Sequence, residues 1–213
     1  MKKAVLFSLG LYLLLLVLTI DVSFIILGKE DLRLFSKPLL MPLLLGYYSK
    51  GRPLSRKRDL RIVSALLLSF LGDLFLLFPW GFVLGLGSFL LAHIFYILEL
   101  KKRQERPYNF FYAVVLLLTL GAVLWKLWQE LGDLKVPVLL YAGVLVFMAL
   151  QAAATRSWKL FLGGALFVAS DGILAFELFG AESTLGAVLV MLSYVGAQVL
   201  LVKGLKDTGA IST

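Results

Sequence analysis

Apolar runs of about 20 residues follow one another along almost the whole chain, separated by short breaks that contain charged residues, proline or glycine. A helix needs about 20 predominantly apolar residues to cross the hydrocarbon core of a bilayer. The pattern predicts eight such helices, at about residues 4–27, 32–48, 60–78, 82–100, 108–128, 137–154, 160–179 and 184–203. We therefore expect an all-α polytopic membrane protein with eight transmembrane helices.

The composition agrees with the pattern, because 61% of the 213 residues are hydrophobic and only 16% are charged. A soluble domain of this length cannot remove so much apolar surface from water. The breaks are too short for an extramembrane domain and join neighbouring antiparallel helices. We expect residues 1–213 to form a single integral membrane domain. Its first apolar run is too long for a signal peptide and is expected to be retained as a helix.

The net charge of +8 is explained by where the basic residues lie. Most of the 21 lysines and arginines fall in alternate breaks, above all in SKGRPLSRKRDLR and KKRQER. Cytoplasmic loops of membrane proteins carry such an excess, so both termini are expected in the cytoplasm. Topology accounts for the charge without a nucleic-acid partner, and no sequence feature points to an obligatory protein partner.

Two aspartates, Asp73 and Asp171, interrupt otherwise apolar runs. An ionisable group inside a membrane helix costs about 2.5 to 3.5 kcal/mol on insertion scales, which makes each one a functional hypothesis. Other polar residues within the spans are Lys37 and Tyr141 toward the outer side, His93 slightly past the middle of its span, and Gln198 on the cytoplasmic side. Most of the charge lies between the midplane and the outer leaflet, which predicts a polar pocket open to that side. Asp21 and Glu177 are expected at the outer interface, where hydration is inexpensive.

Helical spacing places several of these residues on shared faces, since residues three or four apart are neighbours on a helix. Ser69 lies one turn before Asp73, and Ser170 adjoins Asp171. The same spacing joins Gly85, Phe89, His93 and Tyr96 on one span, and Gly163, Phe167 and Asp171 on another. Small residues allow close helix approach and hydroxyl groups supply hydrogen bonds to buried acids, so these faces are expected to turn inward.

A faint internal repeat relates the two halves. Asp73 precedes Tyr96 by 23 residues, and Asp171 precedes Tyr194 by the same number. A parallel duplication of four helices would place the two aspartates opposite each other across an axis along the membrane normal.

The residue types limit the chemistry. The chain has no cysteine and one histidine, which excludes disulfides and thiolate sites and leaves any zinc site dependent on carboxylates. We predict no metal and no cofactor. Ser69 and Ser170 have no histidine and aspartate at a spacing suited to a serine nucleophile.

Four groups of residues in sequence carry a resemblance to a known family. They are Ser36-Lys37-Pro38 with Met41; Ser69 with Gly72-Asp73; GLGSFLLAHIFYI with Gly85, Phe89, His93 and Tyr96; and Gly164 with Ser170-Asp171. In this order and spacing, from about residue 32 to about residue 200, they resemble the YhhN family of lysoplasmalogenases.

The resemblance implies an eight-helix membrane hydrolase that cleaves the vinyl ether bond of lysoplasmalogens, giving a fatty aldehyde and glycerophosphoethanolamine or glycerophosphocholine. Its partners would be the lysophospholipid substrate and membrane lipids, and its expected location is the bacterial cytoplasmic membrane. Such a reaction needs one protonated carboxyl group and one ionised carboxylate, roles that we assign to Asp73 and Asp171 without deciding which takes which. The predicted supporting or substrate-binding residues are Lys37, His93, Tyr96, Ser69, Ser170, Tyr141, Tyr194 and Gln198.

Two other functions use the same acids. A small lipid or proton-coupled transporter would employ Lys37, Asp73 and Asp171 as a proton relay or substrate site. An intramembrane aspartyl protease also has two acids, but leucine and phenylalanine precede Gly72-Asp73 where the GxGD motif of those proteases begins. The transporter is therefore the stronger alternative.

Overall fold

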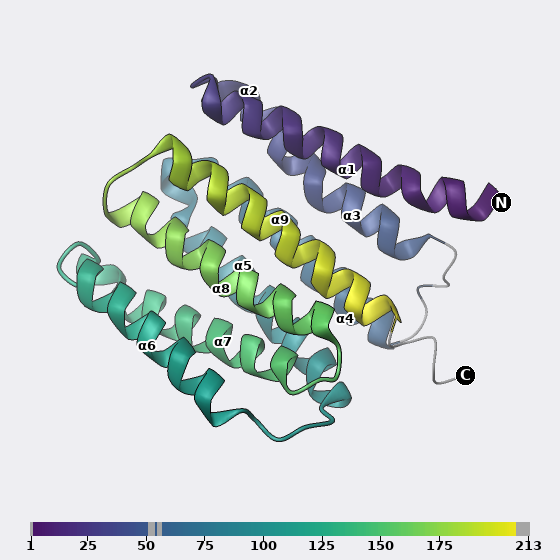
Figure 1. Cartoon of the computed structure of the whole chain (residues 1–213). Helices are drawn as coiled ribbons and strands as arrows, with labels where there is room; N and C mark the ends of the chain where they lie inside the picture. Colours follow the sequence, from purple (N-terminus) through teal and green to yellow (C-terminus); the bar gives the residue numbers. More distant parts are fainter. Residues whose placement is uncertain (1, 51–53, 55–56, 208–213) are drawn as a thin grey trace. The chain divides into compact units, whose positions relative to one another are not determined.

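The computed structural model describes residues 2–50, 54 and 57–207, with side chains from residue 9 onward, and this part of the chain contains helices and no strand. The main helices are α1 (Lys2–Ile26), α2 (Glu30–Ser36), α3 (Leu40–Ser49), α4 (Lys57–Phe75), α5 (Phe82–Leu100), α6 (Phe110–Leu127), α7 (Lys135–Ala153), α8 (Trp158–Phe179) and α9 (Thr184–Asp207) (Figure 1). Short 3-10 helices are η1 (Lys37–Leu39), η2 (Pro79–Gly81), η3 (Lys101–Arg103) and η4 (Gly132–Leu134). The predicted all-α fold class is confirmed.

The eight predicted helical segments are all present, but the second is divided into α2, η1 and α3. The division falls at Pro38 and Pro42, because proline lacks the backbone N–H that a continuous helix requires. Six helices of the described chain are long and apolar enough to cross a membrane: α1, α5, α6, α7, α8 and α9. The helices α2 and α3 are each too short to cross a membrane, with 7 and 10 residues, and α4 begins with charged residues. Exactly eight crossings and cytoplasmic termini therefore stay predictions.

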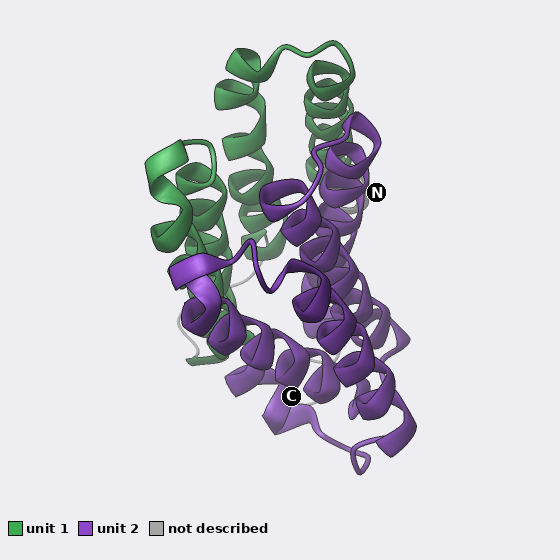
Figure 2. Cartoon of the chain, turned by 90° about the vertical axis from the view of Figure 1, so that its left-hand side faces the viewer, with its two compact units in different colours: residues 1–96 green, residues 97–213 purple. Residues whose placement is uncertain are grey.

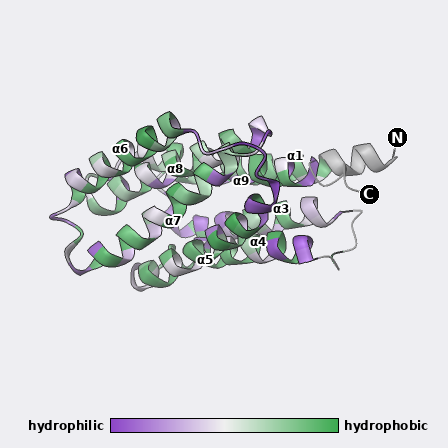
Figure 3. Ribbon diagram, turned by 90° about the horizontal axis from the view of Figure 1, so that it is seen from below, coloured by the Kyte–Doolittle hydropathy of each residue, from purple (hydrophilic) through white to green (hydrophobic). Residues whose placement is uncertain are grey.

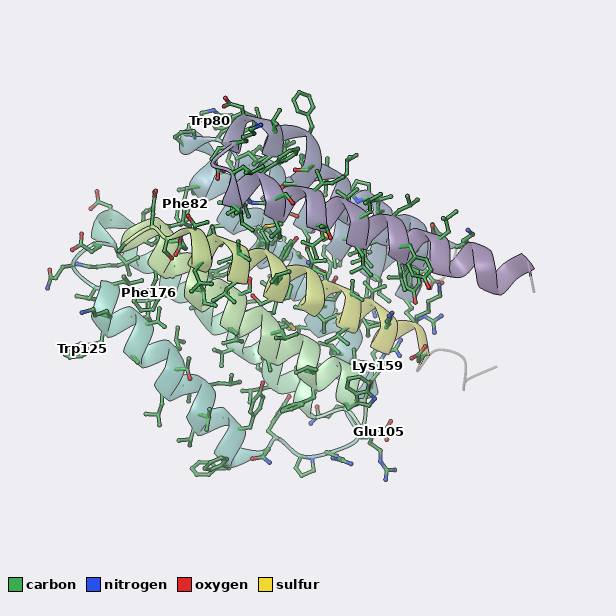
Figure 4. All side chains as sticks on the ribbon, turned by 45° about the horizontal axis from the view of Figure 1, so that its top comes forward. Trp80, Phe82, Glu105, Trp125, Lys159 and Phe176 are labelled. Carbon is green, nitrogen blue, oxygen red and sulfur yellow. The ribbon has the colours of Figure 1, made fainter. Side chains whose placement is uncertain are left out.

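The apolar character of the helices extends along most of their length, as the hydropathy colouring of Figure 3 shows. Tryptophans lie near helix ends with exposed rings: Trp80, Trp125, Trp128 and Trp158. Figure 4 shows Trp125 projecting from the end of α6. Amphipathic indole rings are typical of membrane interfaces. These features identify an integral membrane protein.

Three helix boundaries have clear local causes. The last turn of α1 closes with a bond from Lys29 N to Phe24 O, and Gly28 takes a φ of +64°, which favours glycine. Asn109 caps α6 by accepting a hydrogen bond from Tyr112 N at 3.0 Å. Between α4 and α5, a Cβ at Gly81 would lie 2.2 Å from the carbonyl oxygen of Phe75, so this tight turn requires glycine.

The chain forms two compact units, residues 1–96 and 97–213 (Figure 2). In the first unit, α1 packs on α2 and α3, and α3 packs on α4. In the second unit, α8 packs on α6, α7 and α9. The single domain predicted for residues 1–213 stays a prediction.

Glycines bring α8 and α9 of the second unit close together. A Cβ at Gly163 on α8 would lie 3.1 Å from Leu201 N and 3.2 Å from Ala197 O on α9. About one turn away, a Cβ at Gly204 on α9 would lie 2.6 Å from the side chain of Leu160 on α8. Such backbone approach is typical of membrane helix pairs, where dispersion contacts replace the hydrophobic effect as the source of association.

Candidate active site

Asp73 lies in the last turn of α4 and is only 2% exposed. Ser69, one turn earlier on the same face, is fully buried. Gly72 allows α5 to approach this point, because a Cβ on Gly72 would lie 2.6 Å from the ring of Phe89. The sequence groups around Asp73 and Phe89 therefore meet where α4 and α5 pack.

Lys37 is the first residue of η1, and η1 packs against α4. Pro38 follows it, at a position in the first turn where the missing backbone N–H costs nothing. Burial disfavours the ammonium form of Lys37, whereas electrostatic interaction with Asp73 favours it. Weaker interactions come from Arg33, which opposes the charge, and from Asp21 and Glu30, which favour it. The structure thus brings together the lysine and the acid that the sequence singled out, although they lie 36 residues apart.

His93 and Tyr96 on α5 are both fully buried in the first unit. Tyr96 lies within electrostatic range of Tyr48 on α3. The hydroxyl of Tyr48 donates a 2.6 Å hydrogen bond to Asp59 Oδ1 on α4. Polar groups therefore continue from Tyr96 toward the first turns of α4.

Asp59 and Tyr48 were not predicted. Asp59 lies in the basic run SRKRDLR, which suggested a hydrated loop, yet it is 2% exposed. Its second partner is Arg58, whose Nε lies 3.5 Å from Asp59 Oδ1. An acid within a basic run is a weak signal, because the same pattern occurs on hydrated surfaces.

The expectation that Asp21 is hydrated at the outer interface is wrong. Asp21 on α1 is fully buried. Its Oδ1 accepts a 2.6 Å hydrogen bond from Ser36 Oγ, and its Oδ2 lies 3.5 Å from Arg33 Nη2. The criterion that selected Asp73 and Asp171, an acid within an apolar run, also applies to Asp21. Glu177 is half-buried and accepts hydrogen bonds from the backbone N and hydroxyl of Ser183.

Asp171, on α8 in the second unit, is half-buried and accepts a hydrogen bond at Oδ2 from the hydroxyl of Tyr141 on α7. Tyr141 is 8% exposed. Because the two residues come from different helices, the bond links α7 to α8 at the acid. A hydroxyl that donates to a carboxylate stabilises its ionised form and fixes its orientation.

The other predicted residues of the second unit lie between α8 and α9. Ser170 Oγ donates to the carbonyl oxygen of Val190 at 3.1 Å, so its hydroxyl joins the two helices. Tyr194 packs edge-to-face on Phe167, with ring centroids 5.6 Å apart. Gln198, one turn beyond Tyr194, is fully buried.

The two predicted catalytic acids lie in different units, Asp73 in the first and Asp171 in the second. Their predicted arrangement across an axis stays a prediction. Among the described residues, no group of three or more histidines and acids is placed to hold a metal ion.

Apolar helices that surround partnered buried acids define the class of protein: a helical integral membrane protein with polar sites inside its apolar units. The chain belongs to the YhhN family, whose profile matches residues 32–205.

Curated relatives carry the name lysoplasmalogenase. The Mycobacterium bovis protein is 34% identical over 177 residues, which cover 77% of this chain and 67% of the relative. The Mycobacterium tuberculosis protein matches with the same figures. Lysoplasmalogenase TMEM86B of Homo sapiens is 31% identical over 144 residues, covering 65% of this chain and 60% of the relative. No solved structure matches the chain.

Proposed function

We propose that this protein is a lysoplasmalogenase, a membrane hydrolase that cleaves the vinyl ether bond of lysoplasmalogens. The observation that carries the proposal is its 34% identity to relatives of that name over most of the chain. The buried acids agree with it, because hydrolysis of a vinyl ether is acid-catalysed chemistry. The expected products are a fatty aldehyde and glycerophosphoethanolamine or glycerophosphocholine.

The reaction consumes one water molecule. A carboxylic acid donates its proton to the vinyl carbon beta to the ether oxygen, and the resulting oxocarbenium ion is attacked by water at the carbon bonded to oxygen. That water loses a proton to a carboxylate, and the hemiacetal collapses to the aldehyde and the glycerol hydroxyl. One group must therefore begin protonated and one ionised.

Asp73 and Asp171 are the acids proposed for these two roles. Lys37 interacts electrostatically with Asp73. A neighbouring cation favours the ionised form of a carboxylate. The ammonium form of Lys37 would therefore favour Asp73 as the carboxylate that stabilises the oxocarbenium ion and activates water, and the role of proton donor is proposed for Asp171.

The remaining predicted residues would position these groups or bind the lipid. Lys37 is proposed to orient Asp73 or to receive the lipid phosphate, and His93 with Tyr96 to orient the acid or the water. Ser69, Ser170, Tyr194 and Gln198 are proposed as supporting residues, because their side chains are almost completely buried beside the acid-bearing helices. The proposed location is a bacterial cytoplasmic membrane, with eight crossings and both termini in the cytoplasm.

The test is aldehyde release from lysoplasmalogen micelles by purified protein, in the presence of a chelator. Asp73→Asn and Asp171→Asn are compared with Asp31→Asn and Asp133→Asn, two exposed acids. General acid–base groups contribute about 10²- to 10⁴-fold, so the first pair should lose at least about 100-fold in kcat. The second pair should retain the parent activity.

A folded parent protein that releases no aldehyde from ethanolamine or choline substrates would contradict the proposal. Transport of the intact lipid by the same protein would then favour the transporter. If the chelator abolishes aldehyde release, the metal-free mechanism is contradicted, but the proposed reaction is not.

A further inference from the structure

Asp21 is a fully buried acid on α1, and nothing in the family match, which begins at residue 32, assigns it a role. It lies in an apolar span of mean hydropathy 2.5, where an ionisable group is expensive to insert. Its contacts go to the residues just before Lys37: the hydroxyl of Ser36 at 2.6 Å and the guanidinium of Arg33 at 3.5 Å. Asp21 therefore ties α1 to the segment that carries Lys37.

The charges around Lys37 explain why an acid is needed at this place. Arg33 lies one helical turn before Lys37 and adds a second positive charge, with a side chain only 13% exposed. Its other partner is Glu30, at 2.8 Å, but Glu30 is 64% exposed and its charge is screened by solvent. Asp21 is thus the buried countercharge of Arg33.

Asp73 is the other buried acid that acts on Lys37. If Arg33 lacked a buried countercharge, its repulsion would disfavour the ammonium form of Lys37 and its charge would compete for Asp73. Asp21 is thus in direct contact with Arg33, while Asp73 is the acid with the largest electrostatic effect on Lys37.

We propose that Asp21 is a positioning residue for Lys37: it holds Ser36 and neutralises Arg33, so that the charge of Arg33 does not repel the ammonium form of Lys37. The consequence for catalysis rests on the proposed function, whereas the effect of Asp21 on the charge of Lys37 does not depend on it.

The decisive variants are Asp21→Asn and the double variant Asp21→Asn with Arg33→Gln. Asparagine keeps an acceptor for Ser36 but removes the charge, so kcat for aldehyde release should fall about tenfold or more with little change in KM. Removing the charge of Arg33 as well should restore at least about threefold, as a double-mutant cycle reveals for coupled charges. The matched control is Asp31→Asn, an exposed acid on α2.

A second readout follows Lys37 without catalysis. The rate at which an amine-reactive acylating reagent modifies Lys37 is measured by mass spectrometry on protein in detergent. Loss of the countercharge favours the neutral, nucleophilic amine, so labelling should rise several-fold in Asp21→Asn and return toward the parent rate in the double variant.

If the labelling rate and kcat of Asp21→Asn equal those of Asp31→Asn, the inference is overturned. It is also overturned if kcat and labelling in the double variant are no closer to the parent values than in Asp21→Asn, because Asp21 would then have a purely structural role. If the parent releases no aldehyde, the proposed function fails, and the labelling comparison still decides the role of Asp21. If Asp21→Asn does not fold, Ser36→Ala decides: it should lower kcat and change Lys37 labelling, and parent values for both would overturn the inference.

Discussion

Three acids within the helices, two of them buried and one half-buried, have a hydrogen-bonding or cationic partner that the fold brings to them. Asp21 meets Ser36 and Arg33, Asp59 meets Tyr48, and Asp171 meets Tyr141. A buried carboxylate without such a partner costs several kcal/mol, so each partnership is a requirement of the fold.

The Tyr141–Asp171 bond makes a prediction about activity. Tyr141→Phe removes the hydroxyl that orients Asp171 and keeps the ring, so kcat should fall about 2- to 10-fold, as expected for the loss of a hydrogen bond to an acid that is proposed to act in its protonated form. Aldehyde release is measured beside Tyr12→Phe, whose side chain is 66% exposed. Equal rates for the two variants would remove Tyr141 from the site.

The Tyr48–Asp59 bond makes a prediction about stability. Tyr48→Phe leaves a buried carboxylate with one donor fewer, which should destabilise the protein by about 1 to 3 kcal/mol. Thermal unfolding in detergent measures the change in Tm. Ser49→Ala, an exposed hydroxyl on the same helix, is the control and should leave Tm within about a degree of the parent. An unchanged Tm in Tyr48→Phe would mean that the bond adds nothing to stability.

Among the helices, a common arrangement recurs in the two units. In the first, Lys37 of the second helical segment interacts electrostatically with Asp73 on the third. In the second, Tyr141 on the second helix donates a hydrogen bond to Asp171 on the third. The boundary between the units, after Tyr96, lies near the end of α5, which is the fourth helical segment of the chain. These correspondences support the duplication hypothesis, while the arrangement of one unit relative to the other stays a prediction.

The α8–α9 contact predicts a sharp difference between two glycines. Gly163→Val would push its side chain against the backbone of Leu201 and Ala197, whereas a Cβ at Gly121 on α6 meets nothing within 4 Å. Overpacking costs about 1 to 3 kcal/mol, so Gly163→Val should lower Tm by several degrees and Gly121→Val should not. Similar Tm values for both would contradict close packing of α8 on α9.

At the scale of the whole molecule, single introduced cysteines test the predicted topology, because the sequence contains no cysteine of its own. If both termini are cytoplasmic, the α8–α9 turn faces outward and η3 faces the cytoplasm. Single cysteines at Glu182 and Lys102, both exposed, avoid the hydrogen bonds of Ser183 to Glu177.

A membrane-impermeant thiol reagent added to intact cells should label Glu182→Cys and leave Lys102→Cys unlabelled until the membrane is permeabilised. The opposite pattern would invert the topology and place Asp73 toward the cytoplasmic leaflet. Labelling of both positions from outside would contradict the odd number of crossings predicted between them.

The sequence by itself determined the all-α fold class and the helix limits to within a few residues, because apolar length is a local property of a chain. It singled out Asp73 and Asp171 as candidates, because the cost of a buried charge can also be judged locally. It also placed Ser69 with Asp73, which share one helix face. Only the tertiary structure decided that Asp21 is buried and that Tyr141 donates a hydrogen bond to Asp171. It also decided that Asp59 is buried, although its neighbours in the sequence are basic residues. Helical periodicity tells which residues share a face, but which other helix covers that face depends on packing between segments far apart in the chain.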